Sequence, residues 1–308
     1  MGKSSETGKS PRVVIAEPSG FCFGVRRAIG KLEASLEQRG RVYSIGSPIH
    51  NPQETARLEE MGLVIVEGAE EIPERAAVFI RAHGLPAKDR HGLEERNVEL
   101  VDGTCPFVLN VQRKAAFLDG EGYDVVVLGD EKHPEVQAIA GSVQKGAVIL
   151  PPGGDVPASL EGRRIGIVSQ TTQRPLDLSD LAAKSAFVGK EIRIYNTICK
   201  ATIERQKAVE QLAGAVDGMI VIGGRNSANT GKLFAIARTF NTRTLWVEHA
   251  GEMDGRWLQG KSTIGIAAGA STPDRLILDL ITMLAPTQGV KEDGRQNDDG
   301  RTEERKHQ

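Results

Sequence analysis

The stretch CFGVRRAIGKLEASLEQRGRVYSIG, residues 22–46, holds a cysteine, a helix-forming run, a glycine, a short apolar strand pattern and a second glycine. The same order occurs twice more, at residues 105–129 and 199–223, and in each copy 24 residues separate the cysteine from the final glycine. The helix-forming runs cover residues 23–38, 106–118 and 200–215. A pattern that recurs at fixed spacing indicates one structural unit used three times.

Polar residues also recur in each copy. One follows the final glycine by four positions, and another follows a third strand pattern later in the copy. These residues are His50, His133 and Ser227 at the first position and His83, Thr171 and Ser271 at the second. Short strands alternating with helices predict the α/β class, with mainly parallel sheets and right-handed crossovers. Since ligands bind at the carboxyl ends of such strands, we expect these side chains to meet around a common centre.

The repeat also predicts how the chain is divided. We expect three similar α/β units over residues 12–103, 104–197 and 198–286. The polar residues 1–11 and the charged, glycine-rich residues 287–308 are predicted to be disordered because they offer little apolar surface to bury.

Composition narrows the classes of function. A net charge of −2 gives no positive field for nucleic acid or an anionic membrane. No apolar run approaches the roughly 18 residues of a membrane span, and the polar start lacks the core of a signal peptide. Three cysteines make a disulfide framework improbable and favour a reducing cytoplasm. We therefore expect a cytoplasmic protein.

Each cysteine stands at a predicted helix start, where the helix dipole lowers a thiol pKa and favours a metal ligand or a nucleophile. Buried cysteines that act only as small hydrophobic residues are one alternative. A structural zinc site is another, but the sequence has no C-x-x-C pair. Three thiolates around one centre suit an iron–sulfur cluster, which four cysteines normally hold. One iron would then be open to substrate as a Lewis acid.

The polar residues favour an anion as ligand. Histidines, hydroxyls and an amide near helix starts and glycine-rich loops are typical of phosphate pockets. The loop GGRNSANTGK, residues 223–232, contributes Ser227 and Asn229, although it is not a Walker motif and an ordinary turn is the alternative. Glu135, two residues after His133, is a candidate proton donor, or else a helix-start glutamate that interacts with the dipole.

The motifs SGFCFGVRRAI, SPIHN, RAHG, DGTCPFV, HPEV, SQTT, ICKATIERQ, NSAN and GAS follow one another in this order between Val13 and Leu284. They resemble the 4-hydroxy-3-methylbut-2-enyl diphosphate reductase family, the LytB-type iron–sulfur reductases of the methylerythritol phosphate route to isoprenoids. The resemblance implies three α/β domains in pseudo-threefold arrangement around one 4Fe–4S cluster with three cysteine ligands and one open iron. It implies that Cys22, Cys105 and Cys199 hold the cluster and that Glu135 donates a proton. The implied diphosphate ligands are His50, His83, His133, Thr171, Ser227, Asn229 and Ser271.

The resemblance further implies that an allylic diphosphate is reductively dehydroxylated to isopentenyl and dimethylallyl diphosphate. Reduced ferredoxin or flavodoxin would supply the electrons, and neither nucleic acid nor membrane is an expected partner. Ala228 departs from the family pattern of two adjacent serines, which removes one hydroxyl contact but keeps the backbone N–H. A cluster-dependent hydro-lyase without net electron transfer and a non-catalytic iron–sulfur sensor are the alternatives.

Overall fold

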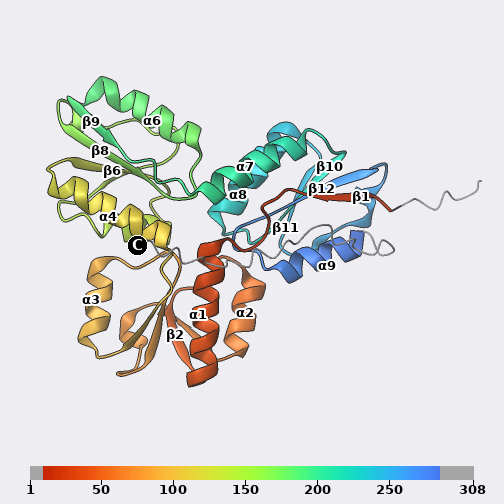
Figure 1. Cartoon of the computed structure of the whole chain (residues 1–308), viewed down its shortest axis with the longest axis horizontal. Helices are drawn as coiled ribbons and strands as arrows, with labels where there is room; N and C mark the ends of the chain where they lie inside the picture. Colours follow the sequence, from red (N-terminus) through yellow and green to blue (C-terminus); the bar gives the residue numbers. More distant parts are fainter. Residues whose placement is uncertain (1–9, 285–308) are drawn as a thin grey trace, which may run out of the picture.

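The computed structural model describes residues 10–284, which form three lobes around a common centre (Figure 1). Each lobe is built on one four-stranded sheet. All the strand pairings within these sheets are parallel, which confirms the predicted α/β class. The disorder predicted for residues 1–11 and 287–308 falls almost wholly outside the described range.

The first unit has the strand order β3-β2-β4-β5. Its elements are α1 (Phe23–Arg39), β2 (Val42–Ile45), α2 (Pro52–Glu60), β3 (Leu63–Val66), η1 (Ala69–Glu71), β4 (Ala77–Ile80), α3 (Ala87–Glu95) and β5 (Glu99–Asp102). Helix α1 buries Leu32 and Leu36, one turn apart on one face, in a core with Val42 and Phe79. This packing holds the Cys22 end of α1 beside the sheet.

The second unit repeats this plan with the order β7-β6-β8-β9. Its elements are α4 (Pro106–Gly120), β6 (Asp124–Leu128), α5 (Pro134–Ala140), β7 (Val148–Leu150), η2 (Ala158–Leu160), β8 (Arg164–Ser169), α6 (Pro175–Val188) and β9 (Glu191–Ile194). The residues of β6 from Val125 to Leu128 are all buried. A continuous apolar run of this kind is typical of a central parallel strand that helices cover on both faces.

The third unit has the order β1-β12-β10-β11. Its elements are β1 (Arg12–Ile15), α7 (Lys200–Ala213), β10 (Gly218–Ile222), α8 (Ala228–Phe240), β11 (Thr244–Val247), η3 (Ala250–Glu252), η4 (Gly255–Leu258), β12 (Thr263–Ala268) and α9 (Asp274–Leu284). None of the helices within residues 10–284 has the length and hydropathy needed to cross a membrane.

The position of β1 corrects the boundary predicted at residue 12, because β1 belongs to the third sheet. It pairs with β12, with Val13 opposite Ile264, and in Figure 1 it lies, coloured red, beside the blue strands. The reason is the repeat itself. β5 precedes Cys105 and completes the first sheet, and β9 precedes Cys199 and completes the second. The strand before each cysteine therefore closes the sheet of the preceding copy, which for β1 is the third.

Candidate functional site

All three cysteines occupy the N-cap positions of long helices: Cys22 before α1, Cys105 before α4 and Cys199 before α7. Each backbone N–H donates to a carbonyl in a loop that follows a central strand. The pairs are Cys22 with Ala270 (3.2 Å), Cys105 with Ala82 (3.0 Å) and Cys199 with Thr171 (3.0 Å). Those carbonyls belong to, or lie next to, the residues predicted to bind substrate. The cysteines and the polar loops are thus fixed to one another.

Gly24 lies close to the thiols of both Cys22 and Cys105. A Cβ atom built at Gly24 would lie 2.4 Å from the Sγ of Cys105 and 4.0 Å from the Sγ of Cys22. The sequence did not single out this glycine. Its lack of a side chain makes room for the Cys105 thiol.

The thiol pKa values differ from the expectation based on helix starts alone. Burial raises the pKa of Cys105 to about 11. The backbone N–H groups of Phe107 and Val108 favour the thiolate and lower this pKa, but by less. Burial also raises the pKa of Cys199. Desolvation therefore outweighs the helix N-terminus in the protein without a metal. A coordinated cation reverses this balance, because it deprotonates a thiol outright.

Three histidine rings converge beside the cysteines. The ring centroids of His50 and His83 are 4.6 Å apart, and each lies 5.3 Å from that of His133. One nitrogen from each ring lies within 4.8 Å of the others. His50 and His83 follow β2 and β4 of the first unit, whereas His133 follows β6 of the second. The cluster could bind a metal ion or an anion, and the hydrogen bonds distinguish the two.

The Nδ1 atom of His133 accepts the backbone N–H of Glu135 at 3.1 Å. A neutral imidazole has one donor and one acceptor, so His133 carries its proton on Nε2 and can donate to an anion. Burial lowers the pKa of His50 to about 4 and that of His133 to about 3. Within residues 10–284, Nε2 of His50 and Nδ1 of His83 are buried without a hydrogen-bond partner. Because His133 in this tautomer has no free lone pair to offer a metal ion, the arrangement suits an anion better than a cation.

The third unit supplies the remaining wall. Ser227 caps α8, its Oγ accepting the N–H of Thr230 at 3.3 Å, and Ala228 is the first residue of that helix. The side-chain nitrogen of Asn229 is buried and finds no partner in the described part of the chain. A Cβ atom at Gly224 would lie 2.3 Å from the carbonyl oxygen of His50, so the glycine-rich loop lies directly against the first unit.

Glu135 is a buried carboxyl group, only 2% exposed. The N–H of Thr171 donates to Oε1 at 2.6 Å and the hydroxyl of Thr171 donates to Oε2 at 3.0 Å. Burial raises the pKa of Glu135, while the two Thr171 bonds and the charge of Lys232 oppose the rise. Because burial dominates, the protonated acid is favoured here more than in water.

Lys232 is a contributor that the sequence did not single out, although it ends the loop GGRNSANTGK. Its Nζ donates to the carbonyl of Thr172 at 3.0 Å and to Oε1 of Gln173 at 2.6 Å. Burial lowers the pKa of Lys232 to about 8. Through these bonds α8 of the third unit supports the second-unit loop that holds Glu135.

The predicted residues come together in one cavity, with a single exception. The cavity is lined by Cys22, His50, His83, Cys105, His133, Glu135, Thr171, Ser227, Ala228, Asn229 and Ser271. Cys199 is outside this lining, but its thiol is near enough to Cys22 for that group's charge to raise its pKa. The lining residues that sequence reasoning missed are Gly24, Val25, Ala82, Val108 and Ala270. Most of them are small or apolar and carry no chemical signal in a sequence.

Comparisons with known proteins agree with this geometry. The 4-hydroxy-3-methylbut-2-enyl diphosphate reductase of Geobacter sp. (strain M21) is 42% identical over 274 residues, covering 89% of this chain and 97% of the relative. The protein of the same name from Aquifex aeolicus (strain VF5) is 42% identical over 270 residues, covering 86% and 93%.

Solved structures show the same likeness. A structure of (E)-4-hydroxy-3-methyl-but-2-enyl diphosphate reductase, the terminal enzyme of the non-mevalonate pathway, is 38% identical with a TM-score of 0.68, covering 90% of this chain and 99% of its own. The E-1-hydroxy-2-methyl-but-2-enyl-4-diphosphate reductase from Plasmodium falciparum shares the fold, with a TM-score of 0.83 at 24% identity and coverage of 90% and 89%. The family model of the LytB protein matches residues 13–285. The chain therefore belongs to the LytB family.

Proposed function

We propose that the protein is a 4-hydroxy-3-methylbut-2-enyl diphosphate reductase, which converts that substrate to isopentenyl and dimethylallyl diphosphate. The reaction consumes two electrons and two protons, and the hydroxyl group leaves as water. The observation that supports this most is the single cavity in which thiols, unpaired histidine nitrogens and a buried carboxyl group lie together. The names of the relatives point to the same reaction.

Membership of the LytB family implies an iron–sulfur cluster. The donor set fits such a group, because three helix starts bring three thiols close enough for the charge of Cys22 to act on Cys105 and Cys199, and no C-x-x-C pair is present to form a zinc site. We assign one 4Fe–4S cluster to Cys22, Cys105 and Cys199, with one iron free of protein ligands. When bound, the cluster supplies electrons and a Lewis-acidic iron at the substrate hydroxyl.

The diphosphate group is assigned to the histidine cluster and the third-unit wall. His133 offers an Nε2–H, His50 and His83 offer unpaired nitrogens, and Asn229 offers an unpaired amide. Ser227 and Ser271 add hydroxyl groups from loops at strand ends. A bound polyanion would raise the histidine pKa values by charge attraction and strengthen these hydrogen bonds.

Glu135 is assigned as the proton donor. Its raised pKa keeps a proton available at a carboxylate oxygen, and Thr171 fixes both oxygens in place. A hydroxyl group leaves readily only when it is protonated on departure, so a positioned acid accelerates this step. An external one-electron carrier such as ferredoxin or flavodoxin completes the reaction by delivering electrons.

The test is anaerobic purification followed by incubation with the allylic diphosphate and dithionite. We expect about four irons per chain with matching sulfide, and turnover that depends on the reductant. Cys22→Ser should remove iron and activity together, while the exposed Lys200→Ala, next to Cys199, serves as the matched control that retains both. Stoichiometric zinc without sulfide would contradict the cluster assignment. Turnover without any reductant would instead identify a hydro-lyase.

A further inference from the structure

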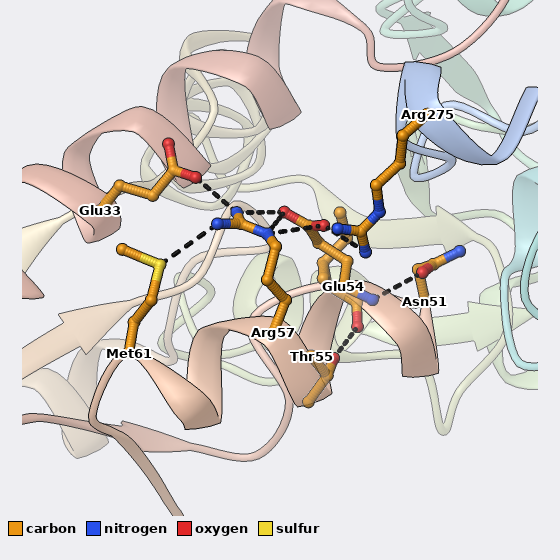
Figure 2. Close-up of polar contacts among 8 residues, drawn as sticks. Glu33, Asn51, Glu54, Thr55, Arg57, Met61 and Arg275 are labelled. Atoms are coloured by element: carbon orange, nitrogen blue, oxygen red, sulfur yellow. Dashed lines mark hydrogen bonds and ion pairs between the residues drawn. The ribbon is translucent and has the colours of Figure 1, made fainter. Parts of the chain in front are cut away.

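Glu54 is a buried acidic side chain that the proposed reaction does not use. It lies in the first turn of α2, it is 2% exposed, and its backbone N–H donates to Oδ1 of Asn51 at 2.9 Å. Figure 2 shows its carboxylate between the guanidinium groups of Arg57 and Arg275. A carboxylate removed from water is tolerated only when cations compensate it, so both arginines matter.

Arg57 and Arg275 hold the carboxylate of Glu54 from two sides, and Nε of Arg57 is 3.2 Å from each of its oxygens. Nη2 of Arg57 is 2.6 Å from Oε1, whereas Nη2 of Arg275 is 3.0 Å from Oε2 (Figure 2). Arg57 lies on α2 itself, one turn further along. Arg275 is the second residue of α9, in the third unit. Oε2 of Glu54 is therefore bound by Arg57 within the first unit and, across the boundary between two units, by Arg275.

The helices joined by this ion pair both begin beside the cavity. His50 stands immediately before Asn51, the N-cap of α2. Ser271 stands three residues before α9, and the carbonyl of its neighbour Ala270 accepts the N–H of Cys22. The ion pair thus joins the first turns of the two helices whose preceding loops carry His50 and Ser271.

We propose that the Glu54–Arg275 ion pair is a positioning contact that sets the spacing of His50 and Ser271 and so fits the anion pocket to its diphosphate. This inference rests on the proposed function of that pocket. The contact of Gly224 with the His50 carbonyl supports it, because the third unit already touches the backbone of His50. Neither Glu54 nor Arg275 lines the cavity, so the pair acts through the loops that it joins.

The same network offers a matched control. Arg57 also binds Glu33 of α1, and that ion pair lies wholly within the first unit (Figure 2). Glu33→Gln therefore removes an ion pair from the same arginine without loosening the contact between units. The pair of Arg26 and Asp274 also joins α1 to α9, but at 3.5 Å and with both side chains more than half exposed it contributes little.

The experiment uses the anaerobically prepared holoenzyme. KM and kcat for the allylic diphosphate and the inhibition constant of inorganic diphosphate are measured for the wild type, Arg275→Gln, Arg275→Lys and Glu33→Gln. Arg275→Gln should raise KM and the inhibition constant about 5- to 20-fold, with kcat within about twofold. Iron content should match the wild type. Arg275→Lys should recover part of the loss, and Glu33→Gln should stay within about twofold of the wild type.

Several results would overturn the proposal. One is an unchanged KM in Arg275→Gln, and another is an equal rise in Glu33→Gln. In a His50→Ala background Arg275→Gln should add little, because the pair acts through His50, and a fully additive effect would contradict this. If Arg275→Gln does not fold, Glu54→Gln removes the charge from the other side of the same ion pair, and a wild-type KM in that variant opposes the proposal. Wild-type enzyme that inorganic diphosphate does not inhibit would refute the pocket assignment itself, and this inference with it.

Discussion

Gly24→Ala should reduce cluster binding strongly while leaving the fold intact. The new Cβ would lie 2.4 Å from the Cys105 Sγ and 3.2 Å from the Cys105 Cβ. Non-bonded heavy atoms need about 3.5–4.0 Å, so the thiol has to move by at least about 1 Å. Metal–ligand distances tolerate changes of only about 0.2 Å. The displacement is several times larger than the site can absorb, so the Cys105 thiol can no longer serve as a ligand.

The matched control is Gly30→Ala on the same helix. A Cβ at Gly30 meets no atom within 4 Å, so there the substitution only removes the glycine penalty, a gain of about 0.5–1 kcal/mol in helix stability. Iron and sulfide per chain are measured after anaerobic reconstitution, and thermal unfolding is followed on the protein without cluster. We expect Gly24→Ala to hold less than about half of the wild-type iron. Gly30→Ala should hold the full amount.

Unfolding of the cluster-free protein separates a steric effect at the thiol from damage to the fold. Without a cluster the Cys105 side chain can rotate away from a new methyl group, so the Gly24→Ala melting temperature should stay close to that of the wild type. Wild-type iron content and turnover in Gly24→Ala would refute the reasoning. So would an equal loss of iron in Gly30→Ala.

Glu135→Gln should keep cluster and substrate binding but lower kcat at least about 100-fold, measured with saturating reductant, because the amide cannot give up a proton. His50→Ala and Ser227→Ala should each raise KM with unchanged iron content, since each loses a hydrogen bond of roughly 1–3 kcal/mol to the diphosphate; an unchanged KM would contradict the anion assignment. Ala228→Ser should bind inorganic diphosphate as well as the wild type or better, by competition against substrate. The free energy of unfolding should decrease as the pH is lowered, because the folded pKa values of His50 (about 4) and His133 (about 3) lie below the ordinary 6.5. As the pH is lowered, the unfolded chain binds protons before the folded chain does, so the stabilisation is complete above about pH 6.5 and declines towards pH 4. At pH 5 the loss should reach up to about 2 kcal/mol per histidine, measured by urea titration. The decline should be shallower in His50→Ala.

The repeat carries most of the fold information in this sequence. The strand patterns before the final glycines of the second and third copies are observed as β6 and β10, and the helix expected to start at residue 23 does so. The placement of β1 was wrong because an apolar strand pattern identifies a strand but not the sheet edge that it joins. Only the comparison of all three copies, each closed by the strand before the next cysteine, identifies the partner.

The sequence predicted which residues at the carboxyl ends of strands lie together in the site. His50, Thr171 and Ser271 lie far apart in the chain and line one cavity, because the carboxyl ends of the central strands face the same centre. Their roles in binding stay predictions. The raised pKa of Cys105 was not predictable, since it depends on burial by other segments, whereas the helix start is visible locally. Nor does any local pattern show that Glu54 is buried, because a helical glutamate is usually solvated.

Because β1 precedes the first unit in the chain but belongs to the third sheet, the three units are connected in a closed ring. Each junction between units is a short segment ending in a cysteine: Cys105 between the first and second, Cys199 between the second and third, and Cys22 between the third and first. Three bodies hinged in a line can rotate independently, but three bodies hinged in a triangle cannot. A change of angle at one hinge has to be taken up at the other two. The positions of the three walls of the central cavity are therefore coupled to one another.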